Sequence, residues 1–71
     1  MRILITLNTA LTKANMTQRE LARQTGIRIP SINEMYHNQT VRLPLDNLAK
    51  ICKVLQCDIT DILKLEKEQS E

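Results

Sequence analysis

Apolar residues recur along the first part of the chain with the three- and four-residue spacing of an amphipathic helix. A short β-prone segment, residues 2–6, comes first and could be either an edge strand or an arm that contacts a second copy. The helical spacing then begins, with apolar positions at Leu7, Ala10, Leu11 and Ala14. Asn15 is expected to end this helix, because asparagine tolerates the left-handed backbone of a helix terminus.

The clearest local signal is a capping box at residues 17–20. In this arrangement Thr17 accepts a hydrogen bond from the backbone of Glu20, and the Glu20 side chain returns one to the backbone of Thr17. Met16 and Leu21 flank the box and are placed to form a hydrophobic staple. The helix is expected to stop at Gly26, which can adopt a left-handed conformation without strain.

A third helix is predicted from about residue 29 to residue 37, with Pro30 in its first turn, where a missing amide hydrogen costs little. Two of its residues, with Ile27 before it, point to the core, namely Ile32 and Met35. Another set points elsewhere, namely Ile29, Pro30, Asn33, Glu34 and His37. Asn38 is expected to end the helix.

A fourth helix is predicted from about Pro44, with an apolar stripe that Ile51 widens, at Leu45, Leu48, Ala49, Cys52 and Leu55. Asp58 or Thr60 could then cap a fifth short helix carrying Ile59, Ile62 and Leu63. The sequence therefore predicts an all-α domain of five helices over residues 1–65. The polar tail, residues 66–71, and the residues just before it from Lys64 are expected to fray.

Length and composition exclude several classes of fold and function. The chain has 71 residues, one glycine, two prolines and one aromatic residue, Tyr36, which excludes a turn-rich all-β fold. A chain this short has little room for both a core and an enclosed catalytic pocket. No stretch approaches the ~20 apolar residues of a membrane span, and no signal peptide is recognisable, so a cytoplasmic protein is expected.

The cysteines and the single histidine indicate neither a metal site nor a cofactor. Cys52 and Cys57 are five residues apart, which is not a metal-binding spacing, and His37 is the only histidine. Both cysteines are interpreted as buried thiols in a reducing compartment. A disulfide between them is the alternative, and it would need a bend that the end of the fourth helix could supply.

Charge is unevenly distributed. Residues 1–44 hold six basic and two acidic residues, a balance of +4, whereas residues 45–71 hold four basic and six acidic ones, a balance of −2. A basic front half suggests an anionic partner. An ordinary solvated surface is the alternative interpretation of the charge alone.

The two helices around Gly26 have the spacing of a helix-turn-helix unit. Counted from Gln18, the fifth residue is small, the ninth turns the chain, and the tenth, fifteenth and eighteenth seat the second helix on the core. These positions are Ala22, Gly26, Ile27, Ile32 and Met35. An ordinary helical hairpin has the same packing needs and is the plainer alternative.

At this point the sequence resembles the Cro/cI-type, or Xre-like, helix-turn-helix proteins. The resemblance rests on residues 16–27 (MTQRELARQTGI) and residues 48–59 (LAKICKVLQCDI), with YHN at 36–38 and VRL at 41–43 between them. It covers residues 7–65 and is greatest for very small regulators of Gram-positive bacteria and their phages. It implies a DNA-binding domain with the motif at about residues 17–37.

The resemblance also assigns roles to residues. Thr17 and Gln18 would contact the DNA backbone, and the second helix of the motif would enter the major groove of double-stranded DNA. Arg28 would read guanine, Asn33 adenine and Ile29 a thymine methyl group, with Pro30 beside them. Glu34 would accept from cytosine or repel phosphate. Arg42, together with the backbone of Asn38 and Gln39, would bind phosphate, and His37 could join this contact.

Two departures from the family pattern bear on these roles. Ile29 and Pro30 replace polar residues often found there, so specificity can depend on DNA shape. Leu11 and Tyr36 stand where many relatives carry a buried arginine–glutamate pair, and losing both members leaves no buried charge unpaired.

The resulting hypothesis is a transcriptional repressor that binds a palindromic operator as a homodimer. The dimer surface could be residues 1–6, or the apolar residues Leu43, Ile59, Ile62, Leu63 and Leu65, most of which could instead close the monomer core. The alternative function is a protein-interaction module, such as an antirepressor. An enzyme is not expected, because no nucleophile–base pair or phosphate loop is recognisable, and no small-molecule effector is evident.

Overall fold

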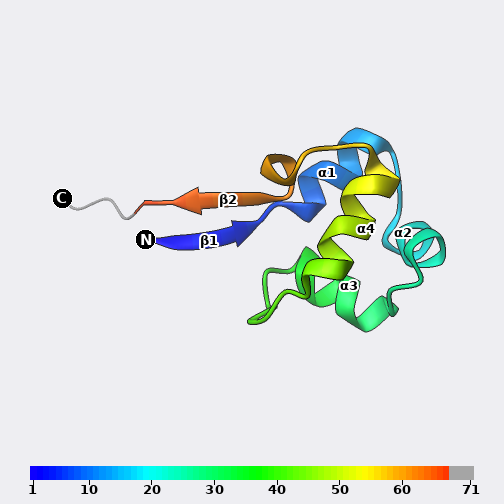
Figure 1. The fold of residues 1–71 in the computed structure, drawn as a ribbon, viewed down its shortest axis with the longest axis horizontal. Coiled ribbons are helices and arrows are strands. Elements are labelled where there is room, and N and C mark those ends of the chain that lie inside the picture. Colours follow the sequence, from blue (N-terminus) through cyan, green and yellow to red (C-terminus); the bar gives the residue numbers. More distant parts are fainter. Residues whose placement is uncertain (68–71) are drawn as a thin grey trace.

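The computed structural model describes residues 1–67 and contains four α-helices, one 3-10 turn and a two-stranded ribbon (Figure 1). The elements are β1 (Arg2–Ile5), α1 (Leu7–Ala14), α2 (Gln18–Thr25), α3 (Ile29–Tyr36), α4 (Leu45–Leu55), η1 (Ile59–Asp61) and β2 (Leu63–Glu66). The helices form one body, and the ribbon projects from it at the end away from α2.

Left-handed residues end three of the helices. Asn15 ends α1 with φ of 56°, Gly26 ends α2 with φ of 77°, and Gln56 ends α4 with φ of 53°. The first two stops are confirmed predictions. The left-handed conformation of Gln56 was not predicted, because glutamine is not a residue type that favours it.

The capping box at the start of α2 is only half formed. Thr17 Oγ1 accepts a hydrogen bond from the Glu20 amide at 3.1 Å, as predicted. The Glu20 carboxylate does not return it, because it binds the Arg23 guanidinium and, at 2.6 Å, the Gln24 amide one turn further on. Both hydrogen bonds lower the pKa of the Glu20 carboxyl group, and the bond from Arg23 has the larger effect.

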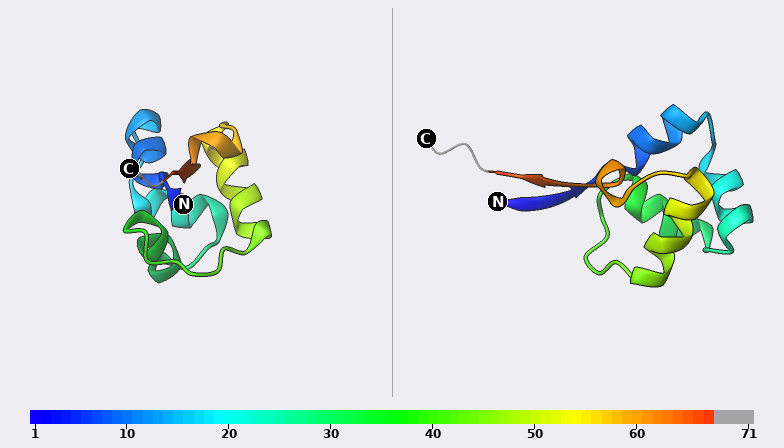
Figure 2. Two further views of the ribbon diagram at one scale, coloured as in Figure 1. Left: turned by 90° about the vertical axis from the view of Figure 1, so that its left-hand side faces the viewer. Right: turned by 45° about the horizontal axis from the view of Figure 1, so that its top comes forward.

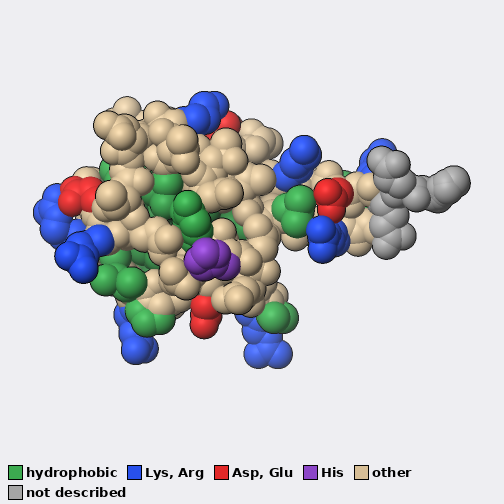
Figure 3. All heavy atoms as spheres, turned by 180° about the vertical axis from the view of Figure 1, so that it is seen from behind, with side chains coloured by type: hydrophobic (Ala, Val, Ile, Leu, Met, Phe, Trp, Pro, Cys, Tyr) green, Lys and Arg blue, Asp and Glu red, His purple; other side chains and the backbone are tan. Residues whose placement is uncertain are grey.

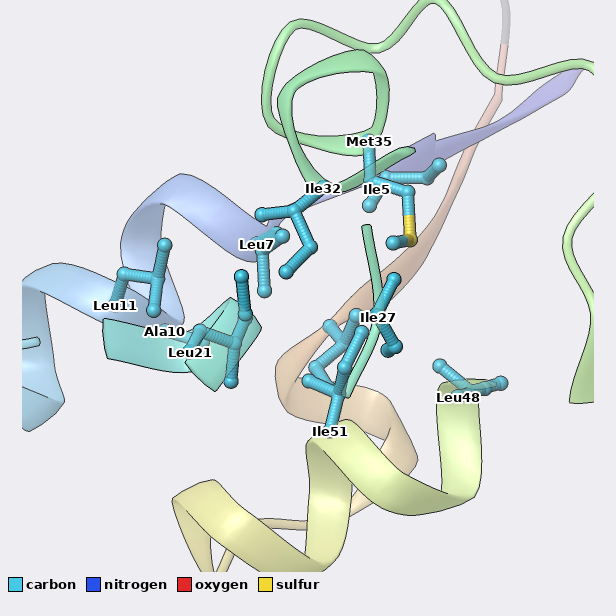
Figure 4. Close-up of a cluster of buried hydrophobic side chains, with 12 residues drawn as sticks. Ile5, Leu7, Ala10, Leu11, Leu21, Ile27, Ile32, Met35, Leu48 and Ile51 are labelled. Carbon is cyan, nitrogen blue, oxygen red and sulfur yellow. The ribbon is translucent and has the colours of Figure 1, made fainter. Parts of the chain in front are cut away.

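The core is aliphatic and lies where the four helices meet (Figure 4). The largest fully buried side chains come one each from α1, α2, α3, α4 and the segment between η1 and β2, namely Leu7, Leu21, Ile32, Ile51 and Ile62. The predicted inward positions of α3 are confirmed, since Ile32 and Met35 are buried.

The predicted fifth helix is wrong. Asp58 does cap the segment, and Asp61 returns a bond to the Asp58 amide at 3.0 Å, but only one 3-10 turn forms. Leu63–Glu66 then pairs with β1 as a strand, so these residues do not form a helix or a frayed end. The apolar positions Leu63 and Leu65 alternate as a strand requires, and pairing with β1 prevails over the helical spacing. The remainder of the predicted tail, residues 68–71, lies outside the described residues.

The ribbon is antiparallel, with Ile3 opposite Leu65 and Ile5 opposite Leu63. Residues directly opposite one another point to the same face of a sheet. One face of the ribbon is therefore apolar, whereas the other carries Arg2, whose Nε donates to Glu66 at 2.9 Å. The right-hand view of Figure 2 shows the ribbon projecting away from the helices.

The base of the ribbon is held to the end of α3 by one side chain. Asn38 Oδ1 accepts from the Ile5 amide at 2.7 Å, and Asn38 Nδ2 donates to the Ile5 carbonyl at 2.8 Å. The side chain thus pairs with β1 as a neighbouring strand would, while its own backbone is left-handed at φ of 58°.

The predicted apolar stripe of α4 is only partly correct. Leu48 is buried, but Leu45 is 78% exposed and Ala49 is also exposed. Ile51 is also buried, as predicted, and Cys52 and Leu55 pack half-buried against the core. The predicted stripe therefore extends too far only at Leu45 and Ala49.

Cys52 and Cys57 are free thiols, and they are half-buried where buried thiols were predicted. Within residues 1–67, no helix combines the length and apolar character needed to cross a membrane.

Candidate nucleic-acid interface

The turn between α2 and α3 is held by backbone geometry and by one hydroxyl. Gly26 has nothing within 4 Å of the point where a Cβ would lie, so the positive φ and not crowding requires glycine. Thr25 is buried, and its hydroxyl donates to the Leu21 carbonyl at 2.7 Å and accepts from the Ile27 amide at 3.2 Å. This role of Thr25 was not predicted, although a threonine directly before a helix-ending glycine was an available signal.

The N-terminus of α2 presents donors suited to an anion. Thr17 Oγ1 uses one acceptor position for the Glu20 amide, so its hydroxyl hydrogen remains available. The backbone amides of Gln18 and Arg19 donate to no group in the described part of the chain. Unpaired amides and the helix dipole make this end attractive to phosphate.

Two predicted contact residues from different helices touch one another. Asn33 Nδ2 on α3 donates to Gln18 Oε1 on α2 at 3.2 Å. This bond uses one hydrogen of the Asn33 amide and leaves its oxygen and its second hydrogen without a partner in residues 1–67. A donor beside an acceptor is the pair that the adenine edge in the major groove requires.

The remaining predicted base-contact residues lie on the exposed side of α3. Arg28 immediately precedes the helix in an extended conformation and forms no ion pair with any described residue. Ile29 is 49% exposed at the first position of α3. The two other members of the set, Pro30 and Glu34, are also exposed.

The segment after α3 supports only part of its predicted phosphate grip. The Asn38 amide donates to the Met35 carbonyl at 3.2 Å, and the Gln39 amide donates to the Glu34 carbonyl at 2.8 Å. Neither amide is therefore available to phosphate, and the Asn38 side chain is occupied by Ile5. In this structure Asn38 follows the end of α3 and anchors β1, and its contact with DNA stays a prediction.

Arg42 and His37 remain as exposed side chains in that segment. Arg42 forms no ion pair within the described residues and shares a shallow hollow with Glu34. The His37 ring packs edge-on against Tyr36, with ring centroids 5.2 Å apart. Figure 3 shows basic side chains spaced along the lower edge of one face, with the histidine and an acidic side chain between them.

Leu11 and Tyr36, which replace the buried charged pair of many relatives, pack against the core without such a pair. Leu11 is buried, and Tyr36 is half-buried against the core. Together with Met16 and Gln18 they line an open hollow of about 370 Å³ at the start of α2. No buried side-chain nitrogen or oxygen in residues 1–67 lacks a hydrogen-bond partner.

This arrangement can be compared with known proteins. The Cro/C1-type HTH DNA-binding domain family matches residues 6–68, which is most of the chain. The chain belongs to this family. The match extends through α1 to α4 and into the ribbon, so the Cro/C1-type assignment concerns the whole helical body and not the turn alone.

Two relatives of this Cro/C1-type domain agree with the assignment. The first is YozG of Bacillus subtilis strain 168, an uncharacterized HTH-type transcriptional regulator. It is 29% identical over 69 residues, which are 97% of this chain and 82% of YozG. The second is a crystal structure from Bacteroides fragilis of a candidate DNA-binding protein, with a TM-score of 0.79 and 25% identity over 89% of this chain and 100% of that one.

Proposed function

We propose that this Cro/C1-type domain is a sequence-specific transcriptional repressor that binds a palindromic operator as two copies. The observation that carries the proposal is the Asn33–Gln18 hydrogen bond, which orients a base-reading amide on α3 beside the anion-attracting end of α2. The bond links the two helices of the motif, and in helix-turn-helix proteins the second of these helices enters the major groove.

In this proposal α3 enters the major groove by its N-terminal end. Arg28 reads guanine with its two-pronged guanidinium, and Asn33 reads adenine with its remaining donor and acceptor. Ile29 contacts a thymine methyl group. Glu34 accepts from cytosine or, where a phosphate approaches, repels it and excludes a wrong register. These roles are supported by the exposure of all four side chains.

Phosphate contacts fix the register in the same proposal. Thr17 and Gln18 bind one phosphate through the hydroxyl, the amide side chain and the start of α2. Arg42 and His37 bind another beyond the end of α3. The basic balance of residues 1–44 supports this placement, since it attracts DNA before any base is read.

Two copies are proposed because one domain of this size reaches few base pairs. Recognition helices of paired domains enter successive major grooves, about 34 Å apart, and the operator then mirrors the two-fold axis of the protein. A domain bound in this way represses by occupying a promoter and needs no further activity.

The experiment is selection of bound duplexes from a randomised library, followed by affinity measurements against salt concentration. A palindromic consensus with affinity that falls steeply as salt rises is expected. Replacing Arg28 with alanine should lower affinity by about 1–3 kcal/mol and relax one position of the consensus. Replacing Arg42 should lower affinity for all sequences and reduce the salt slope by about 1.

Lys13→Ala is the matched control, because Lys13 is an exposed basic residue in the last turn of α1, outside the proposed interface. It should change neither the consensus nor the salt slope appreciably. Weak binding without a consensus would contradict the proposal. It would instead favour a protein-interaction module, which the exposed apolar Ile29 at the start of α3 supports.

A further inference from the structure

An uncovered apolar surface lies where the ribbon meets the segment between α3 and α4. We call it the apolar groove, a hollow of about 350 Å³ lined among others by Ile3, Val41, Leu43, Leu45, Ile59 and Leu63. Every residue that lines it is uncharged. Val41 is 94% exposed, Leu45 78% and Ile3 65%, so large side chains that usually avoid water lie open to it.

The ribbon continues this surface outward. Its apolar face carries Ile3 and Leu65 near the tip and Ile5 and Leu63 near the base. At the base of the ribbon, Ile5 is buried and Leu63 is half-buried against the helices. At its tip, Ile3 and Leu65 are both exposed. An uncovered two-stranded ribbon is marginally stable in water, and it gains stability when a further apolar surface packs on it.

We propose that a second copy of this chain covers this surface, so that the ribbon tip of each copy lies in the apolar groove of the other. This inference rests on the two-copy binding proposed above and identifies the surface that pairs the copies. A two-fold pair requires one patch to be complementary to itself. Here the same patch combines a projecting apolar strip, the ribbon tip, with an apolar hollow.

Charge supports a second copy as the occupant. Two identical surfaces repel one another where each carries the same unpaired charge, and burying such charges is costly. The groove carries none. The charged pair of the ribbon, Arg2 and Glu66, lies on the opposite face, where it stays in water when the apolar faces meet.

The position of the surface agrees with simultaneous DNA binding. In Figure 1 the ribbon projects from the side of the helical body away from α2. The groove beside it is lined by the ribbon, the segment between α3 and α4, the first turns of α4, and η1. None of its lining residues belongs to α2 or α3, so the groove that the second copy fills does not include Gln18, Arg28 or Asn33.

The first test is sedimentation equilibrium of the full chain without DNA, for the unchanged protein and two matched variants. Leu45→Glu and Ile29→Glu each place the same acid on an exposed aliphatic residue at the first position of a helix, α4 and α3 respectively. An acid at this position is favoured by the helix dipole, so both variants should fold.

The expected result is a dimer for the unchanged protein, at least a tenfold weaker dimer for Leu45→Glu, and unchanged dimerisation for Ile29→Glu. A monomer at all concentrations, or a Leu45→Glu dimer as strong as the original, would overturn the inference. Because DNA is absent, failure here is separate from failure of operator binding. Ile29→Glu should have the opposite pattern, because it should weaken DNA binding and leave dimerisation unchanged.

The second test asks whether the ribbon reaches the other copy's groove. In a background with Cys52 and Cys57 changed to serine, Ile3→Cys and Val41→Cys chains are prepared separately and mixed under mild oxidation. A disulfide between the two different chains is expected, because each copy's Ile3 would lie near the partner's Val41. Lys13→Cys in place of Val41→Cys is the control and should not cross-link. A dimer that never forms the Ile3–Val41 link would overturn the reciprocal arrangement.

Discussion

Asn33 and Gln18 share a hydrogen bond that leaves the Asn33 amide with one donor and one acceptor to present outward. In the proposed complex, this bond would affect specificity through Gln18, which itself touches no base. Rotation of the Asn33 amide about its last torsion would exchange the donor and the acceptor, and the bond to Gln18 opposes that rotation.

Replacing Gln18 or Asn33 with alanine should consequently have coupled effects on operator affinity. The double variant is expected to lose less than the sum of the single losses, by about 0.5–1.5 kcal/mol. The measurement is a double-mutant cycle with the selected operator. Gln18→Ala should also weaken the preference for adenine at the position read by Asn33. Additive losses would show that the two residues act independently.

The contact between Asn38 and Ile5 should be important for stability. Asn38→Asp keeps the shape and tolerates the left-handed backbone, but the carboxylate cannot donate to the Ile5 carbonyl. Leaving that carbonyl beside an acceptor is expected to reduce the free energy of unfolding by about 1–3 kcal/mol. Urea denaturation monitored by circular dichroism provides the measurement.

Asn15→Asp is the matched control for that variant. Asn15 is also left-handed at a helix end, with φ of 56°, but its side chain makes no hydrogen bond within residues 1–67. Only the unfavourable helix-dipole effect of the new charge, about 0.3–1 kcal/mol, is expected. Equal losses for the two variants would mean that the bonds to Ile5 contribute nothing.

The turn at Gly26 should resist substitution for a backbone reason. Gly26→Ala adds a methyl group that meets no neighbour, so the cost comes from the left-handed φ of 77° and should be about 1–2 kcal/mol. Gly26→Asn should lose less, because asparagine adopts this conformation more readily. Thermal unfolding of both variants tests this, and an asparagine variant less stable than the alanine variant would contradict it.

The Cys57 thiol should be a slow nucleophile in the folded protein. Burial raises the pKa of Cys57 above its ordinary value of 9.0, and the neighbouring Cys52 and Asp61 raise it further. In a Cys52→Ser variant, alkylation at pH 8 should be slower in buffer than in urea. Since the unfolded thiol ionises first, Cys57 should also make stability fall as pH rises above 9 and through the folded pKa.

The control for the pH effect is Cys57→Ser, which should flatten the decline in stability between pH 8 and pH 10. Equal alkylation rates in buffer and in urea would show that the fold does not protect this thiol.

The helical body was predictable because local signals and burial agree there. Thr17, Gly26 and the apolar residues of α2 and α3 each obey a rule that depends on neighbours in sequence. The pairing of β1 with β2 joins Ile3 to Leu65, which no local pattern reveals, and Leu63 fits a helix and a strand equally well. The predicted helix after Asp58 therefore failed where a long-range partner decided the structure.

In the candidate site, too, some features could be predicted from the sequence and others could not. The exposure of Arg28, Ile29 and Asn33 follows from helical periodicity. The engagement of the Asn38 side chain and amide could not be foreseen, because it depends on where β1 ends. The exposure of Leu45 was also missed, since a stripe of apolar residues does not reveal which of them lies at its margin.

The two hydrogen bonds between the Asn38 side chain and the Ile5 backbone connect the end of α3 directly to the ribbon. If the copies pair through the ribbon, the energy of pairing and the energy of operator binding are then thermodynamically linked. Such linkage is reciprocal, so the operator strengthens association of the copies by the same factor as association strengthens operator binding. A single amide side chain would thus help set how sharply occupancy of the operator responds to protein concentration.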